Sequence, residues 1–143
     1  MKVATTQSSR PCPCGRLSRS KKLLLLADCC GRFIDHFEDT PAPDAESLMR
    51  SRYTAFVLQR ADYLLATCHP SRRPPAIDFD PDVKWLGLDV RQHRVLDANH
   101  AEVEFVAREK SPGIPAVRLY ERSRFVKDGD APGRWFYVDG DLL

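Results

Sequence analysis

The chain has 143 residues, of which 43% are hydrophobic and 29% are charged, a balance typical of a soluble globular protein with a real core. Its 22 basic and 20 acidic side chains leave a formal net charge of only +2, so the total charge predicts neither a nucleic-acid-binding surface nor a membrane surface. No apolar run approaches the roughly 18 to 20 residues that span a bilayer. We therefore expect a cytoplasmic protein without a membrane segment.

Four of the five cysteines lie in two tight pairs, after a polar segment, residues 1–10, that is predicted to be a disordered tail. In a reducing cytoplasm, paired cysteines more often bind a metal than form disulfides. Four thiolates are the ligand set of a structural zinc site, which leaves no open position for a catalytic water. We predict a structural Zn²⁺ held by Cys12, Cys14, Cys29 and Cys30.

Alternatives to the metal stay open at this stage. Four thiols can pair in three ways as disulfides, although a bridge between the neighbours Cys29 and Cys30 would strain the backbone. The thiols could also stay reduced without a metal. The loop between the pairs is basic, which suits a zinc ion with four thiolates but also describes an ordinary solvated loop. Its basic residues are Arg16, Arg19, Lys21 and Lys22.

Two helices are predicted next along the chain. A proline-containing turn over residues 39–44 precedes them. Asp44 is a suitable N-cap, and apolar residues then recur at three- and four-residue steps as far as Val57. The second helix is shorter and covers residues 61–68.

From residue 84 onward the hydrophobic period changes from 3.6 to 2, which indicates strands. Short polar turns separate the strands and favour an antiparallel meander. The predicted strands cover residues 84–93, 101–110, 116–127 and 134–139. Helices followed by consecutive strands predict an α+β fold, with the helices packed on one face of a curved antiparallel sheet.

The third predicted strand carries a carboxylate, Glu121, on its apolar face. That face is formed by Val117, Leu119, Glu121, Ser123 and Phe125. An inward charge must be paired, neutralised or facing a wet cavity. Paired with Arg50 or Arg52 of the first helix, Glu121 would be a structural brace. Against apolar walls it could exchange protons.

These patterns define a set of candidate site residues. No catalytic residue is assigned, and the candidates for proton transfer are Glu121 and His69. His69 precedes Pro70 and is also interpreted as an ordinary helix-end or core histidine. The candidates for lining a binding pocket are Arg50, Arg52, Tyr53, Trp85, Ser123 and Tyr137.

Several motifs resemble the YchJ-like family of uncharacterised bacterial proteins, over roughly residues 12–140. They are the two cysteine pairs and the segments Leu48 to Phe56, Asp62 to Pro70, Trp85 to Leu88, Glu121 to Phe125 and Trp135 to Gly140. The loop between the cysteine pairs is longer than is usual in such proteins. Cys68 stands where a tryptophan is usual before His-Pro.

The resemblance implies a zinc knuckle of the SEC-C type over residues 11–38, similar to the C-terminal tail of the SecA translocation motor. It also implies a nuclear transport factor two-like domain over residues 39–143, in which helices close a curved sheet into a cone. Related proteins use the cone interior for catalysis, for ligand binding or only for dimer formation, so the fold alone does not decide the activity.

We therefore expect a cytoplasmic binding or adaptor protein rather than an enzyme. The knuckle would dock a protein partner, and the cone would hold a small ligand or a second copy of the chain. The basic loop would fit an acidic surface or RNA, although so few charges are weak evidence. The alternative is a small-molecule enzyme that uses acid-base chemistry in the cone pocket.

Overall fold

The computed structural model describes residues 9–129 and 133–143, so most of the predicted tail lies outside the described residues. The helical elements are η1 (Leu26–Asp28), α2 (Gly31–Ile34), α3 (Ala45–Leu58), α4 (Ala61–Ala66) and η2 (Pro70–Arg72), where η marks a 3-10 helix. The strands are β1 (Lys84–Asp97), β2 (His100–Lys110), β3 (Val117–Asp128) and β4 (Arg134–Leu142). Helices that precede consecutive strands confirm the α+β class. Among the described helices, none is long and apolar enough to cross a membrane.

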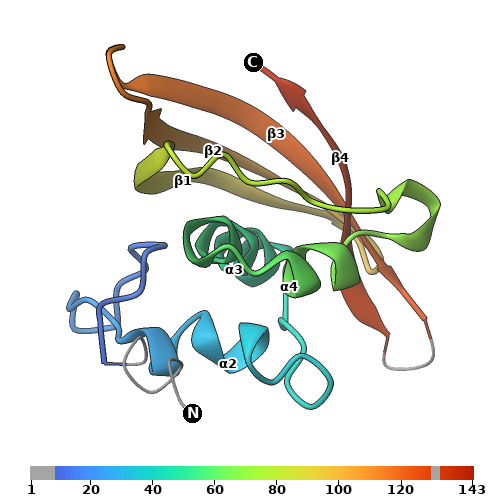
Figure 1. Cartoon of the computed structure of the whole chain (residues 1–143). Coiled ribbons are helices and arrows are strands. Elements are labelled where there is room, and N and C mark those ends of the chain that lie inside the picture. The colour runs from blue at the N-terminus through green and yellow to red at the C-terminus, as the bar shows by residue number, and fades with distance from the viewer. Residues whose placement is uncertain (1–8, 130–132) are drawn as a thin grey trace.

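The four strands form one antiparallel meander in the order β1-β2-β3-β4. The register shifts three times between β1 and β2 and once between β3 and β4, and such bulges increase the twist and bend of a sheet. The sheet is accordingly curved, with α3 and α4 beside its concave face (Figure 1). The sheet itself stays open, with β1 and β4 as its edges, and the predicted closure into a cone by the helices is not confirmed.

Helix α3 begins and ends as its sequence predicts. The Asp44 side chain accepts a hydrogen bond from the Ser47 backbone N–H at 2.7 Å, which satisfies one of the unpaired N–H groups at the helix start. Gln59 ends the helix with a left-handed conformation, φ 56°. The helix lies between the N-terminal segment and the sheet (Figure 1), so both of its sides are covered.

The N-terminal lobe, residues 10–38, begins with a β-hairpin-like loop. Isolated bridges pair Pro11 with Leu25 and Leu17 with Leu23, and Lys21 turns the chain with φ 61°. This pairing absorbs the long segment between the two cysteine pairs and brings its ends together. The greater loop length is therefore compatible with a single cysteine cluster.

The lobe packs against the rest of the chain through one continuous hydrophobic core. Arg134 of β4 donates to the Phe37 carbonyl at 2.9 Å and lies over the Phe37 ring at 4.5 Å. Phe37 in turn meets Tyr63 edge to face, with ring centroids 6.0 Å apart. Arg60 adds an ion pair to Asp35 at 2.8 Å. These contacts fasten the lobe to α4 and to the sheet.

Candidate metal centre and ligand pocket

The four paired cysteines converge at one point in the lobe. Their Sγ atoms all lie within 4.8 Å of one another, and Cys14 Sγ lies 3.7 Å from both Cys12 Sγ and Cys29 Sγ. All four side chains are buried. In the described residues none of the cysteines forms a disulfide. The predicted cluster is therefore present, and its geometry is compatible with a bound metal ion.

Two tight turns aim the thiols at the same point. Gly15 follows the first pair with φ 75° and donates its N–H to the Cys12 carbonyl at 3.1 Å. A residue with a Cβ is strained at that positive φ. On the other side, Cys30 leads directly into α2, where Phe33 and Ile34 donate their N–H groups to its carbonyl at 3.0 Å. Each pair is thus held by its own backbone turn.

The thiols influence one another's protonation. Hydrogen bonds with Cys14, and then with Cys29 and Cys30, lower the pKa of Cys12 well below its usual range. Hydrogen bonds with Cys12 and Cys14 raise the pKa of Cys29 and Cys30. Like charges this close oppose further ionisation, so four thiolates at this spacing need a cation among them.

The cysteine cluster contacts helix α3 directly. Arg50 donates from Nη1 to the Cys14 carbonyl at 3.1 Å and from Nε to Glu46 at 2.8 Å. The Thr54 hydroxyl lies 3.7 Å from Cys12 Sγ. Arg50 was predicted to line the pocket, and the structure places it here instead, because its side chain leaves α3 on the side of the lobe.

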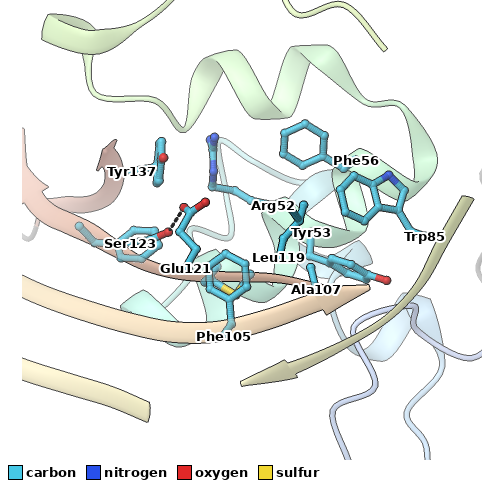
Figure 2. A pocket seen from close by; sticks show the side chains of 12 residues that line it. Arg52, Tyr53, Phe56, Trp85, Phe105, Ala107, Leu119, Glu121, Ser123 and Tyr137 are labelled. Atoms are coloured by element: carbon cyan, nitrogen blue, oxygen red, sulfur yellow. Dashed lines mark hydrogen bonds between the residues drawn. The ribbon is translucent and has the colours of Figure 1, made fainter. Parts of the chain in front are cut away.

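A cavity of about 310 Å³ lies between the other side of α3 and the concave face of the sheet. Its walls are largely apolar, with a few polar side chains gathered at one end (Figure 2). The lining residues are Met49, Arg52, Tyr53, Phe56, Trp85, Phe105, Ala107, Leu119, Glu121, Ser123, Phe125 and Tyr137. An apolar cavity with a small number of convergent polar groups is the usual form of a small-molecule site.

Glu121 belongs to the polar end of the cavity. The Ser123 hydroxyl donates to Glu121 Oε2 at 2.7 Å, shown as the dashed line in Figure 2. Within the described residues no Lys, Arg or His nitrogen lies within 4.0 Å of the Glu121 carboxylate. The structural brace between Glu121 and an arginine is therefore not formed.

Arg52 reaches the same end from helix α3. Its Nη1 donates to the Leu64 carbonyl at 2.9 Å and to the Thr67 hydroxyl at 2.7 Å, and its Nη2 donates to Cys68 Sγ at 3.7 Å. The guanidinium also lies over the Tyr137 ring at 4.5 Å. With a relative exposure of only 9%, Arg52 is a buried and firmly positioned cation.

Aromatic side chains form the opposite end of the cavity. The ring of Trp85 meets that of Tyr53 edge to face, with centroids 5.7 Å apart. The centroid of the Phe56 ring lies 5.9 Å from that of Trp85. Burial raises the pKa of Tyr53 to about 12, so its phenol stays neutral at physiological pH. Tyr137, at the polar end, also has a raised pKa, first because of burial and then because of the Glu121 charge.

His69 does not line the cavity. The Ser71 backbone N–H donates to its Nδ1 at 3.2 Å, so Nε2 carries the proton and donates to Asp128 at 2.7 Å. The ring therefore caps η2 and connects it to the end of β3. The helix-end interpretation fits this position, and the pairing of His69 with Glu121 for proton transfer is not assembled.

The period-two pattern correctly placed most of the inward face of β3, since Leu119, Glu121, Ser123 and Phe125 all line the cavity. Val117 was assigned to the same face but is 41% exposed, and it is the first residue of β3. Six further lining residues were not predicted as pocket residues: Met49, Phe56, Phe105, Ala107, Leu119 and Phe125. Apolar residues are expected both in the wall of a cavity and in a filled core, so residue type alone could not assign them to the pocket.

Fold and cysteine cluster together define a class of protein: a nuclear transport factor two-like (NTF2-like) domain with a four-cysteine cluster at its N-terminal side. A family model described as "YchJ, middle NTF2-like domain" matches residues 44–140. The chain belongs to this YchJ-like family, and several of its relatives are called UPF0225 proteins. One such protein, from Polaromonas sp. (strain JS666 / ATCC BAA-500), is 75% identical over 130 residues, which cover 91% of each chain.

Other relatives extend the likeness. A UPF0225 protein from Methylibium petroleiphilum is 56% identical over 133 residues, covering 92% of this chain and 88% of the relative. The crystal structure of a SEC-C motif containing protein from Psychrobacter arcticus has a TM-score of 0.81 at 32% identity, covering 96% of this chain and 85% of that one. The solution structure of a SEC-C motif containing protein from Rhodopseudomonas palustris has a TM-score of 0.75 at 33% identity, and the match covers 94% of this chain and 99% of that one.

Proposed function

We propose that this chain is a small-ligand binding protein whose ligand occupies the cavity between α3 and the sheet. The observation that carries the proposal is the cavity itself, about 310 Å³ with apolar walls and one polar end. This volume corresponds to roughly ten water molecules at ~30 Å³ each. It lies near the lower limit of known small-molecule sites, roughly 300 Å³, and so suits a compact molecule.

We further propose that the four cysteines hold one structural zinc ion. Zinc–thiolate bonds of about 2.3 Å in a tetrahedron place neighbouring sulfurs about 3.8 Å apart, and the two separations to Cys14 Sγ are both 3.7 Å. When bound, zinc would neutralise the crowded thiolates and cross-link the two turns. Four thiolates leave no open coordination position, which favours a structural role.

Helix α3 connects the metal centre to the cavity. Arg50 and Thr54 face the cysteine cluster, whereas Arg52, Tyr53 and Phe56 line the cavity. Fixing the lobe therefore also fixes one wall of the pocket. The predicted protein partner of the lobe, the predicted homodimer and the cytoplasmic location stay predictions.

Binding is favoured over catalysis by the composition of the polar end. General acid-base catalysis both removes a proton from the substrate and gives one to it, which usually needs an acid and a base within hydrogen-bond reach of the substrate. Glu121 faces the cavity, but His69 is held by Ser71 and Asp128 away from it. The lining also lacks a cysteine and a histidine, and Ser123 donates to Glu121 with no histidine beside it. The Ser–His and Cys–His pairs of covalent catalysis are therefore not formed in the described pocket.

Filling the cavity tests the proposal. Leu119 is a half-buried lining residue, and Leu119→Phe should occupy the cavity while leaving the fold intact. We expect thermal-shift screening of small aromatic compounds to find ligands for the unaltered protein. Leu119→Phe should weaken their binding at least about tenfold, equivalent to about 1.4 kcal/mol.

The matched control is Val117→Phe, which adds the same ring on the same strand outside the cavity. This variant should bind as the unaltered protein does. The proposal fails if no compound binds the unaltered protein, or if the compounds found bind Leu119→Phe undiminished.

A further inference from the structure

We propose that the ligand has a neutral polar end in which a hydrogen-bond donor lies beside an acceptor, as in an amide or a lactam, joined to a flat aromatic body. This inference depends on the proposed binding function and names the chemical class that the cavity selects. Three features of the cavity support it: its charge balance, its unused hydrogen-bonding groups and its aromatic end.

The charges at the polar end balance each other. Arg52 contributes one positive charge and Glu121 one negative charge, and both side chains face the cavity (Figure 2). In the described residues neither has an oppositely charged group within 4.0 Å, so the two are apart from each other. A ligand of either net charge would be attracted by one of them and repelled by the other. A neutral polar group is repelled by neither charge.

The polar end offers unused hydrogen-bonding positions of both kinds, donors on Arg52 and an acceptor on Glu121. Arg52 uses Nη1 on Leu64 and Thr67 and Nη2 on Cys68, while its Nε–H has no acceptor within the described residues. Glu121 receives Ser123 at Oε2, and its Oε1 has no donor among the same residues. A ligand carbonyl can accept from Arg52 and an adjacent N–H can donate to Glu121.

Both groups are held in place before any ligand arrives. Arg52 is fixed by its three protein acceptors and by the Tyr137 ring. Glu121 is fixed by Ser123 and lies against Gly140 of β4, where any added Cβ would collide with the carboxylate. Preorganised groups bind a matching ligand with a smaller loss of conformational entropy.

The rest of the cavity selects the body of the ligand. Tyr53, Phe56 and Trp85 form one cluster of rings, with separations of 5.7 and 5.9 Å between centroids. Phe105 stands directly opposite Glu121 in the register of β2 and β3 and also lines the cavity. Offset and edge-to-face contacts with these rings favour a flat aromatic group.

Three compounds of the same shape separate the alternatives. Benzamide presents a donor and an acceptor without charge, benzoate only acceptors with a negative charge, and benzamidine only donors with a positive charge. Each is titrated at neutral pH into the full chain, loaded with zinc, and the dissociation constant is measured from protein NMR shifts. We expect benzamide to bind about tenfold more tightly than either ion, the size of effect given by one satisfied hydrogen bond to a charged group.

Glu121→Gln checks the role of the charge balance. This variant leaves Arg52 without an opposing charge, so the affinity for benzoate should rise about tenfold relative to the affinity for benzamide. The control is Glu104→Gln, which changes another carboxylate of the sheet, one that pairs with Arg122 instead of lining the cavity. This control should keep the order of the three compounds.

The outcomes separate this inference from the proposed function. If benzoate or benzamidine binds the unaltered protein as tightly as benzamide, the inference is wrong while the cavity stands as a binding site. If Glu121→Gln leaves the order unchanged, the charge balance is not the selecting feature and the inference is likewise wrong. If none of the three compounds binds and the wider screen is also empty, the binding function itself fails.

Discussion

Glu121 is the residue on which the interpretation of the pocket depends. A buried ion pair loses roughly 3 to 5 kcal/mol when one partner is removed, but Glu121 has no cation within 4.0 Å in the described residues. Glu121→Gln keeps an acceptor for Ser123 and removes an unpaired charge. We therefore expect the free energy of unfolding in urea to change by less than about 1 kcal/mol. A loss of several kcal/mol would show that Glu121 is a brace after all.

For single residues, the sequence predicted which way a side chain faces better in the strands than in the helices. Alternation in a strand has only two faces, so Glu121 and Ser123 could be assigned to the inner one. Arg50 and Arg52 are two positions apart on a helix, which separates their side chains by about 200°. Both sides of α3 are covered, one by the lobe and one by the sheet, so hydrophobicity could not show which arginine faces the cavity.

At the scale of elements, local signals located the helices and strands well. Asp44 caps α3 as predicted, and the hairpin between β1 and β2 turns at Asp97 and His100. The predicted end of the first strand, residue 93, was too early, because residues 94–97 are exposed on both faces and show no alternation. Whether the sheet stays open depends on where β1 lies relative to β4, and no local sequence pattern determines the relative position of these two strands.

Metal removal is expected to loosen particular elements. Cys30→Ser deletes one of four ligands, and structural zinc contributes roughly 10 to 16 kcal/mol of apparent binding energy in small zinc domains. We predict loss of zinc and faster amide hydrogen exchange in the lobe and in the first half of α3. Amides shared by β2 and β3 should change much less.

The control for this prediction is Cys68→Ser, since Cys68 is buried but lies outside the cluster. It should retain zinc and the exchange pattern of the lobe. Unchanged exchange of the lobe amides in metal-free Cys30→Ser would contradict a role for the metal in holding this element.

At the scale of the whole molecule, the lobe, α3 and the sheet share one core, so in the zinc-bound protein they should unfold together. Burial raises the pKa of Tyr53 and Tyr63 to about 12, from an ordinary value of 10.0. Between these values the unfolded chain releases the phenol protons while the folded chain keeps them, so stability falls as the pH rises from about 10 to 12. Each tyrosine should contribute roughly 2 kcal/mol to this fall.

Tyr53→Phe should make the alkaline fall in stability shallower, whereas Tyr120→Phe, at a position 38% exposed, should not. Urea unfolding measured across this pH range gives the comparison. Equal slopes for all three proteins would mean that the Tyr53 phenol is not buried as the structure has it.

We propose that helix α3, held by a metal-bound lobe, and the open sheet form a cavity whose polar end binds a neutral ligand. The most direct test is the distance between the Arg52 guanidinium and the Glu121 carboxylate in a high-resolution crystal structure of the zinc-loaded protein with benzamide. We predict that the two side chains stay more than 4.0 Å apart, with the amide bound between them. A direct ion pair across a collapsed cavity that excludes benzamide would contradict the account.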